Sequence, residues 1–245
     1  MKVFGLIGKG ISHSFSANYF NKKFAEEEID AIYHLFDLHS IYDFEVLKER
    51  PDLAGLNVTS PYKRDVIPFL DSLSDEAEKL NAVNVIEFIK KTDGRNILMG
   101  HNTDCAGFGM TLEDVSPTQS ALILGTGGAS SDVALALQKK DIPYKIVSRN
   151  PSGDELDYRQ CSELIPSHKI IINATPVGMH PNTDACPPID YNRITDNHLC
   201  YDLIYNPTET LFLKKAKERG ALTKNGLKML INQAELAWEI WNKGL

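Results

Sequence analysis

Hydrophobic residues in the first 103 positions form short runs that alternate with amphipathic stretches. The continuous runs at 3–8 and 53–58 are typical of buried strands, and apolar spacing over 16–28 predicts a helix with Ser16 as its cap. The same patterns predict strands over 31–38, 82–89 and 96–101 and helices over 41–50 and 62–80. Asp93-Gly94 between the last two strands predicts a hairpin. We therefore expect an α/β substructure that contains an antiparallel pair.

A second alternating series begins at residue 105. It predicts helices over 105–115, 131–140, 208–219 and 227–241 and strands over 121–125, 144–149, 169–176 and 199–205. Regular alternation of strands and helices predicts a parallel, doubly wound sheet. The proline-rich segment 180–188 is expected to be irregular. In the last helix, apolar residues at helical spacing indicate core positions at Leu230, Ile231, Ala234, Trp238 and Trp241.

Composition narrows the class of protein. A chain of 245 residues is long enough for two domains, and a net charge of −7 without a basic stripe argues against nucleic acid as a partner. The four cysteines are far apart and show no C-x-x-C spacing, so neither a disulfide framework nor a metal site is expected. We find no secretory signal and no apolar run long enough for a membrane span, which favours a cytoplasmic location.

The glycine-rich segment GTGGAS, 125–130, lies between a predicted strand and a predicted helix. In this context, glycines let the main chain approach a pyrophosphate, and the start of the helix supplies N–H donors. Ser130 occupies the third small position, so the strict G-x-G-x-x-G pattern is not met. The alternative is a plain glycine-rich turn. Because the whole strand–loop–helix–strand unit is present, we favour dinucleotide binding.

The tip of the next predicted strand indicates which dinucleotide binds. NAD-binding units commonly carry an acidic residue there to accept from the ribose 2′-hydroxyl. This chain has Ser148-Arg149-Asn150 instead. A guanidinium suits a 2′-phosphate, so we expect NADP(H) rather than NAD. The alternative is an exposed arginine at a strand end with no ligand.

Polar residues follow several predicted strands of the first series: Ser14, Ser16, Asn57, Thr59, Lys63, Asn84 and Asp104. Each has a structural alternative, since the serines could cap a helix, Asn57 could be satisfied within a sheet, and Asp104 could be an N-cap. Together they offer hydroxyls, amides, one cation and one carboxylate. That combination suits a small polyhydroxylated acid as the ligand.

These segments together resemble the shikimate dehydrogenase family over nearly the whole chain. The resemblance rests on SHSFS (12–16), NVTSPYK (57–63), NAVNVI (81–86), GHNTDCAGF (100–108), GTGGAS (125–130), SRN (148–150), NATPVGM (173–179), YDLIYNP (201–207) and GLKMLINQ (226–233). It implies NADP-dependent interconversion of 3-dehydroshikimate and shikimate. It also implies a substrate domain, 1–104 completed by 226–245, and a Rossmann domain, 105–225.

The resemblance also implies roles for individual residues. Lys63 would be the catalytic acid and base with Asp104 beside it, and Ser14, Ser16 and Tyr205 would hold the substrate carboxylate. The ring hydroxyls would contact Asn57, Thr59, Lys63, Asn84, Asp104 and Gln233. The cofactor would contact Gly125, Thr126, Gly127, Gly128, Ala129, Ser148, Arg149, Asn150, Leu203, Gly226 and Met229. No metal is implied.

Two departures from the family pattern affect the expected cofactor site. Ser130-Ser131-Asp132 would bring an acid near the phosphates and weaken anion binding, and Pro151–Asp154 lacks the second basic residue usual after Arg149. With these departures Arg149 would hold the 2′-phosphate alone, and the preference for NADP would be modest. A quinate/shikimate dehydrogenase with NAD or dual cofactor use is an alternative. The N-T-D segment and Gln233 match the methylene-tetrahydrofolate dehydrogenases poorly, although the two-domain layout is similar. A non-catalytic dinucleotide-binding module is the third alternative, although Lys63 and Asp104 argue against it. The sequence leaves monomer and homodimer open.

Overall fold

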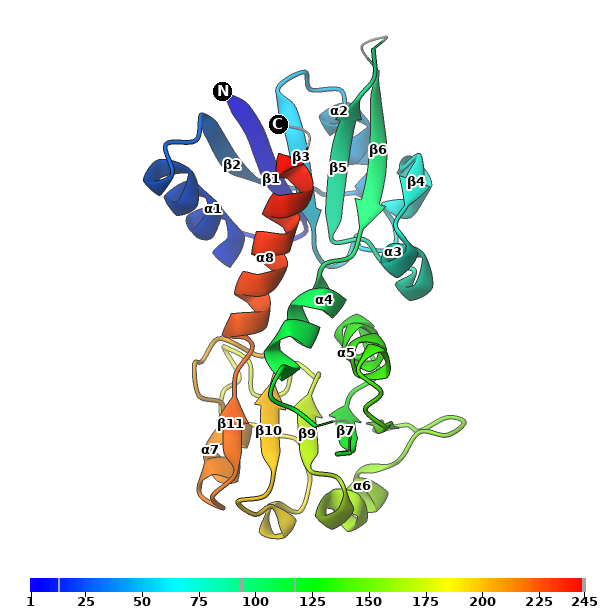
Figure 1. Ribbon diagram of the computed structural model, residues 1–245, viewed down its shortest axis with the longest axis vertical. Coiled ribbons are helices and arrows are strands. Elements are labelled where there is room, and N and C mark those ends of the chain that lie inside the picture. Colours follow the sequence, from blue (N-terminus) through cyan, green and yellow to red (C-terminus); the bar gives the residue numbers. More distant parts are fainter. Residues whose placement is uncertain (13, 93–94, 117, 244–245) are drawn as a thin grey trace. The chain divides into compact units, whose positions relative to one another are not determined.

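The computed structural model describes residues 1–12, 14–92, 95–116 and 118–243, so the predicted turn at Asp93-Gly94 lies outside the described residues. The chain folds into two compact units, Met1–Thr103 with Ala234–Leu245, and Asp104–Gln233. Each unit combines helices with one sheet (Figure 1), which confirms the α/β prediction. Within the described residues, every helix is too short or too polar to span a bilayer.

The first unit is built on a mixed six-stranded sheet. In spatial order its strands are β2 (Ala31–Asp37), β1 (Lys2–Gly8), β3 (Leu53–Val58), β5 (Val85–Lys90), β6 (Asn96–His101) and β4 (Ser72–Leu73). β1 pairs in parallel with β2 and β3, whereas β5 runs antiparallel to both β3 and β6. The antiparallel pair expected from the sequence is thus β5 and β6.

Alternating residues of β1 supply two hydrophobic cores, because successive side chains of a strand point to opposite faces. Val3 and Ile7 pack with residues of α2 (Phe44–Leu47) and α3 (Asp75–Leu80). Phe4 packs on the other face with α1 (Phe15–Glu26) and the C-terminal part of α8 (Leu227–Asn242), where its ring centroid lies 5.0 Å from that of Trp241. Three predicted core positions of the last helix are therefore confirmed, Ala234, Trp238 and Trp241, whereas Leu230 and Ile231 are only half-buried.

One predicted helix in this unit is wrong. Residues 62–80 form turns, the 3₁₀ helix η2 (Ile67–Phe69), β4 and the short α3. Pro68 explains the break, since proline inside an α-helix removes a donor and clashes with the preceding turn. Two smaller differences concern helix starts: η1 (Ile41–Asp43) and α2 replace a single helix over 41–50, and Ser14 rather than Ser16 caps α1.

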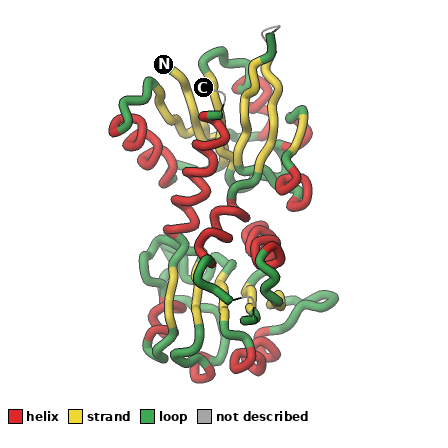
Figure 2. The backbone as a smooth tube through the Cα atoms, in the orientation of Figure 1, coloured by secondary structure: helices red, strands yellow, loops and turns green. Residues whose placement is uncertain are grey.

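The second unit contains the predicted parallel sheet. Its spatial order is β11 (Leu222–Lys224), β10 (Leu199–Asp202), β9 (Ile170–Asn173), β7 (Ala121–Leu124) and β8 (Tyr144–Val147). All of the pairings are parallel. Helices α6 (Tyr158–Leu164) and α7 (Leu211–Lys217) pack on one face, and α4 (Asp104–Gly109) contacts the other through the rings of Phe108 and Tyr201. The helix α5 (Gly128–Lys139) follows β7 (Figure 2).

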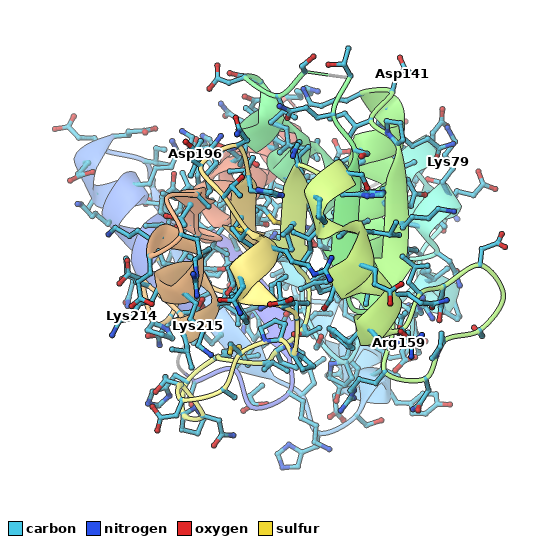
Figure 3. All side chains as sticks on the ribbon, turned by 90° about the horizontal axis from the view of Figure 1, so that it is seen from below. Lys79, Asp141, Arg159, Asp196, Lys214 and Lys215 are labelled. Carbon is cyan, nitrogen blue, oxygen red and sulfur yellow. The ribbon has the colours of Figure 1, made fainter. Side chains whose placement is uncertain are left out.

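Several boundaries in this unit differ from the predictions. The strands end earlier than expected, because the main chain leaves the sheet directly after Asn173 and Asp202. α5 begins at Gly128, three residues before the predicted start, and α7 begins after its cap, Thr210. α6 and β11 were not predicted. The remaining short elements are η3 (Met110–Leu112), η4 (Ile165–Ser167) and η5 (Tyr191–Arg193). Figure 3 shows Arg159 of α6 and Lys214 of α7, both exposed.

Candidate functional site

The strand order of the second unit reverses at β7, which has β8 on one side and β9 on the other. In open α/β sheets, ligands bind outside the carboxyl ends of the strands at such a switch point. Gly125 follows β7 there with φ +113°, and a Cβ added to it would lie 2.9 Å from Cγ2 of Thr175. The positive φ and the close approach both require glycine at this position.

Gly127 and Gly128 differ from Gly125, because no atom of the described residues, apart from the adjacent chain and helix backbone, lies within 4 Å of a Cβ added to either one. Packing within the protein therefore does not require glycine at these two positions. Thr126–Ala129 are exposed, and α5 begins at Gly128. The first N–H groups of a helix have no partner within it, and they attract anions together with the helix dipole. The open space and the N–H donors fit the close approach of a pyrophosphate.

The serine and the acid that follow these glycines are both buried. Ser130 donates from Oγ to the carbonyl oxygen of Gly125 at 2.6 Å, which fixes the loop. Asp132 is only 4 % exposed. The prediction that Asp132 weakens anion binding stays a prediction.

Arg149 lies just beyond the end of β8 and is exposed. Across the described ranges it has no ion-pair partner. The neighbouring Ser148 accepts a hydrogen bond from the main-chain N–H of Asn150 at 3.2 Å, which shapes the turn. The guanidinium is thus available to bind an anion, as a role in holding the 2′-phosphate requires.

The loop after β10 meets the start of α8 at very close range. A Cβ added to Gly226 would lie 1.9 Å from the carbonyl oxygen of Leu203, and the N–H of Gly226 donates to the carbonyl oxygen of Ile204 at 3.1 Å. Met229 is half-buried one turn further along. The predicted cofactor residues Leu203 and Gly226 therefore form one local substructure of the second unit.

A buried polar network beneath these loops was not predicted. Asp202 is fully buried and accepts hydrogen bonds from Asn173, Thr210 and the N–H of Ile204. Burial raises the pKa of the Asp202 carboxyl from 3.8 to about 6, and the three hydrogen bonds oppose that shift. A charged residue at the end of an otherwise apolar strand was the signal in the sequence that could have revealed this network.

In the first unit, the predicted Asn57 and Asn84 belong to one buried network. Asn57 donates from Nδ2 to the carbonyl oxygen of Asn84 at 3.2 Å. Asn84 donates from Nδ2 to Oγ1 of Thr103 at 3.0 Å and accepts from its N–H at 2.8 Å. Both amides are therefore held in fixed orientations. Thr103 belongs to the N-T-D segment, but the sequence did not indicate it as a site residue.

Tyr33 joins this network from β2 and was also missed. Its phenol donates to Oδ1 of Asn57 at 2.7 Å, and its ring stacks on Phe20 of α1 with centroids 4.7 Å apart. Burial raises the pKa of the Tyr33 phenol well above its ordinary value, and the hydroxyl of Ser16 beside it opposes the shift. The phenol thus connects two predicted site residues, Ser16 and Asn57.

Thr59 and Lys63 lie in the turn that follows β3. The N–H of Thr59 donates to the carbonyl oxygen of Ile7 at 2.9 Å. The carbonyl oxygen of Lys63 accepts from the N–H of Val83 at 2.8 Å, and its side chain is half-buried. The main chain at both positions is therefore tied to neighbouring segments of the first unit.

The predicted site residues divide between the two units. Ser14, Ser16, Asn57, Thr59, Lys63 and Asn84 belong to the first unit. The second unit contains Asp104, Tyr205 and Gln233 together with every predicted cofactor residue. Asp104 is the first residue of α4 and half-buried, Tyr205 is 39 % exposed, and Gln233 donates to the carbonyl oxygen of Leu230 at 2.8 Å.

Comparison with known proteins gives a consistent result. A family model described as the shikimate dehydrogenase substrate binding domain matches residues 6–86. The chain is 39 % identical over 258 residues to the shikimate dehydrogenase (NADP(+)) of Pelagibacter ubique, in a match that covers 99 % of this chain and 94 % of that protein.

Solved structures agree with the sequence comparison. The shikimate 5-dehydrogenase of Thermus thermophilus in complex with NADP(H) and shikimate is 27 % identical, with a TM-score of 0.86 over 99 % of this chain and 94 % of that one. The quinate dehydrogenase of Corynebacterium glutamicum in complex with NAD is also 27 % identical, with a TM-score of 0.85 over the same shares. The chain belongs to the shikimate dehydrogenase family.

Proposed function

We propose that this protein is an NADP-dependent oxidoreductase that interconverts 3-dehydroshikimate and shikimate. The carrying observation is the buried network of Asn57, Asn84 and Thr103, which fixes amide and hydroxyl groups within the unit that holds the matched substrate-binding segment. Fixed polar groups of this kind suit the hydroxyls of a small ring, because a site built to hydrogen-bond hydroxyls discriminates strongly against analogues that lack them.

Substrate binding divides among three sets of side chains in this proposal. Ser14, Ser16 and Tyr205 hold the carboxylate. The hydroxyls of the ring contact Asn57, Thr59, Lys63, Asn84, Asp104 and Gln233. The two asparagines already have fixed orientations, so they bind without first losing rotamer freedom.

Bound NADPH supplies the hydride that reduces the ring ketone. The ammonium group of Lys63 donates a proton to the ketone oxygen and stabilises the negative charge that develops there. Lysine is ordinarily protonated at neutral pH, with a pKa of about 10.4, which suits the reduction. Oxidation of shikimate needs the neutral amine as a base, so that direction should become faster as the pH rises. Asp104 is the second catalytic residue of this proposal.

The cofactor site in this proposal lies at the carboxyl edge of the second sheet. The segment 125–129 approaches the pyrophosphate. Arg149 binds the 2′-phosphate, and its neighbours Ser148 and Asn150 also contact the cofactor. Leu203 and Gly226 also contact the cofactor, and Met229 lies near the nicotinamide. The open space around Gly127 and Gly128 supports this arrangement.

A second candidate is a quinate/shikimate dehydrogenase that also uses NAD. Two observations favour keeping it. Arg149 is followed by Pro151–Asp154 without a second basic residue, and the similar C. glutamicum protein is a quinate dehydrogenase in complex with NAD. In this candidate the preference for NADP over NAD is modest, because the guanidinium of Arg149 is the single basic group that binds the 2′-phosphate.

The deciding experiment follows NAD(P)H absorbance for the purified protein with shikimate or quinate as substrate and NADP+ or NAD+ as cofactor. We expect shikimate-dependent reduction of NADP+ to be the most efficient of the four reactions. Comparable efficiency with quinate and NAD+ would favour the second candidate. If the folded protein catalyses none of the four reactions, the result would favour a non-catalytic dinucleotide-binding module.

The cellular setting and the assembly are part of the same proposal. Membership of a family of metabolic enzymes supports a cytoplasmic location. We propose a monomer or a homodimer with a small-molecule substrate and no nucleic-acid or membrane partner. Sedimentation velocity at several concentrations distinguishes the two assemblies.

A further inference from the structure

Three segments of the second unit converge on one buried carboxylate, that of Asp202 at the end of β10. Its Oδ1 accepts from Nδ2 of Asn173 at 3.0 Å and from the N–H of Ile204 at 3.0 Å. Its Oδ2 accepts from Oγ1 of Thr210 at 2.6 Å. Each of these three donors belongs to a different segment: the end of β9, the loop after β10, or the cap of α7.

The contact through Asn173 reaches the glycine loop. Oδ1 of Asn173 accepts from Oγ1 of Thr175 at 2.6 Å and from its N–H at 3.1 Å. The methyl group of Thr175 in turn lies 2.9 Å from the position of a Cβ on Gly125. Asp202 therefore fixes Asn173, Asn173 fixes Thr175, and Thr175 packs against the first glycine of the GTGGAS segment.

The contacts of Asp202 with Ile204 and Thr210 link it to two other segments at the carboxyl edge of the second sheet, the start of α8 and the start of α7. The carbonyl oxygen of Ile204 accepts from the N–H of Gly226, and Leu203 next to it packs directly on that glycine. Thr210 accepts from the N–H of Leu213 at 3.3 Å and so caps α7. The loop 203–210 is thus held at both ends by oxygens of one side chain.

The network requires an acceptor at Asp202. An ionised carboxylate only accepts, which matches three converging donors, whereas an asparagine amide would direct its own N–H groups toward at least one of them. Burying this charge is costly, and a well-packed apolar group often stabilises a fold as well or better. A purely structural role therefore gives little reason for a carboxylate here.

We propose that Asp202 is a positioning residue for the cofactor, which holds the loops 125–129, 174–178 and 203–210 in the arrangement that binds NADP(H). This inference rests on the proposed function, because it assumes that these loops contact the dinucleotide. Asp202 itself is buried beneath the loops and touches no reacting group.

The test measures the dissociation constant of NADPH by fluorescence titration, together with KM for NADPH and for shikimate. We expect Asp202→Asn to weaken NADPH binding by about tenfold to a hundredfold, as for the loss of a hydrogen bond to a charged group. KM for shikimate should change by less than about threefold. Thr210→Val should weaken NADPH binding as well, whereas Thr210→Ser keeps the hydroxyl and should bind NADPH like the wild type.

Ile194→Ala is the matched control for lost stability, since Ile194 is 2 % exposed in the core of the same unit and has no part in the network. It should lower the melting temperature while the NADPH affinity stays at the wild-type value. Equal NADPH affinity in wild type, Asp202→Asn and Thr210→Val would overturn the inference, as would an equal loss in Ile194→Ala. If Asp202→Asn does not fold, the difference in NADPH affinity between Thr210→Val and Thr210→Ser tests the inference. A wild type that binds NADPH but turns over no substrate would instead refute the proposed function.

Discussion

The phenol of Tyr33 donates a hydrogen bond of 2.7 Å to Oδ1 of Asn57, and so joins the two strands that flank β1 in the first sheet. This contact fixes which end of the Asn57 amide is the donor. We therefore predict that Tyr33→Phe raises KM for shikimate by about threefold to tenfold, the range expected for one lost hydrogen bond. The KM for NADPH should not change. Steady-state kinetics with each substrate varied in turn measures both effects.

A matched control for this variant is Tyr191→Phe. Tyr191 also donates from a phenol to an oxygen, the carbonyl of Pro187 at 2.9 Å, but it belongs to the second unit. It should cost similar stability and leave KM for shikimate unchanged. If both variants raise KM for shikimate equally, the effect comes from general destabilisation and not from the orientation of Asn57.

Replacement of the proposed proton donor should affect chemistry rather than binding. We predict that Lys63→Ala lowers kcat by about 10²–10⁴-fold, as for the loss of a general acid, with shikimate binding largely kept. Lys79→Ala is the control, because Lys79 is an exposed lysine of α3 in the same unit (Figure 3). Unchanged kcat in Lys63→Ala would refute the assignment of Lys63.

Most strands and the glycine loop were predictable because their signals are local. Buried strands such as β3 and β7 are continuous apolar runs, and the glycines lie directly after one of them. The helix α6 also had a local signal that we did not use: Asp157 and Gln160 form a capping box at its start. Three-residue β11 is too short to show a period of its own.

The missed site residues depend on tertiary contacts that no local pattern reveals. Tyr33 fits the pattern of a half-buried strand, and only the pairing of β2 and β3 with opposite edges of β1 brings its phenol to Asn57. Asp202 meets Asn173 because β10 pairs with β9 in a register that places these two residues opposite each other. The wrong prediction of a helix over 62–80 has a different cause. The apolar residues have helical spacing, but Pro68 within the segment disfavours a continuous helix.

Two glycines should respond to alanine in opposite ways. We predict that Gly128→Ala leaves the melting temperature equal or slightly higher, because no described atom beyond the adjacent backbone lies within 4 Å of the added Cβ and alanine is a better helix former than glycine. NADPH binding should nevertheless weaken, since the new methyl group occupies the space proposed for the pyrophosphate. Gly226→Ala should lower the melting temperature, because its Cβ would lie 1.9 Å from a carbonyl oxygen. Unchanged NADPH affinity in folded Gly128→Ala would contradict the proposed cofactor site.

Arg149 should distinguish the two nicotinamide cofactors. We predict that Arg149→Ala raises KM for NADPH by about threefold to tenfold, a modest effect because exposed charge pairs are weak. KM for NADH should stay nearly constant, since NADH lacks the 2′-phosphate. Arg159→Ala, at an exposed position of α6, is the control for a general change in charge. Equal changes with both cofactors would show that Arg149 does not contact the 2′-phosphate.

The buried carboxyl of Asp202 predicts a specific dependence of stability on pH. Its pKa is about 6 in the folded protein against 3.8 ordinarily, so the folded state binds the proton more tightly than the unfolded state. The contribution of this group to the free energy of unfolding therefore falls as the pH rises, by about 1 kcal/mol between pH 5 and pH 7. Denaturant titrations of wild type and Asp202→Asn across this range measure it as a difference. Asp190→Asn is a control that should give a constant difference over this range, because hydrogen bonds lower the pKa of the Asp190 carboxyl below its ordinary 3.8 and its contribution is lost only at more acidic pH. A difference between wild type and Asp202→Asn that is constant from pH 5 to pH 7 would show that Asp202 does not titrate in this range.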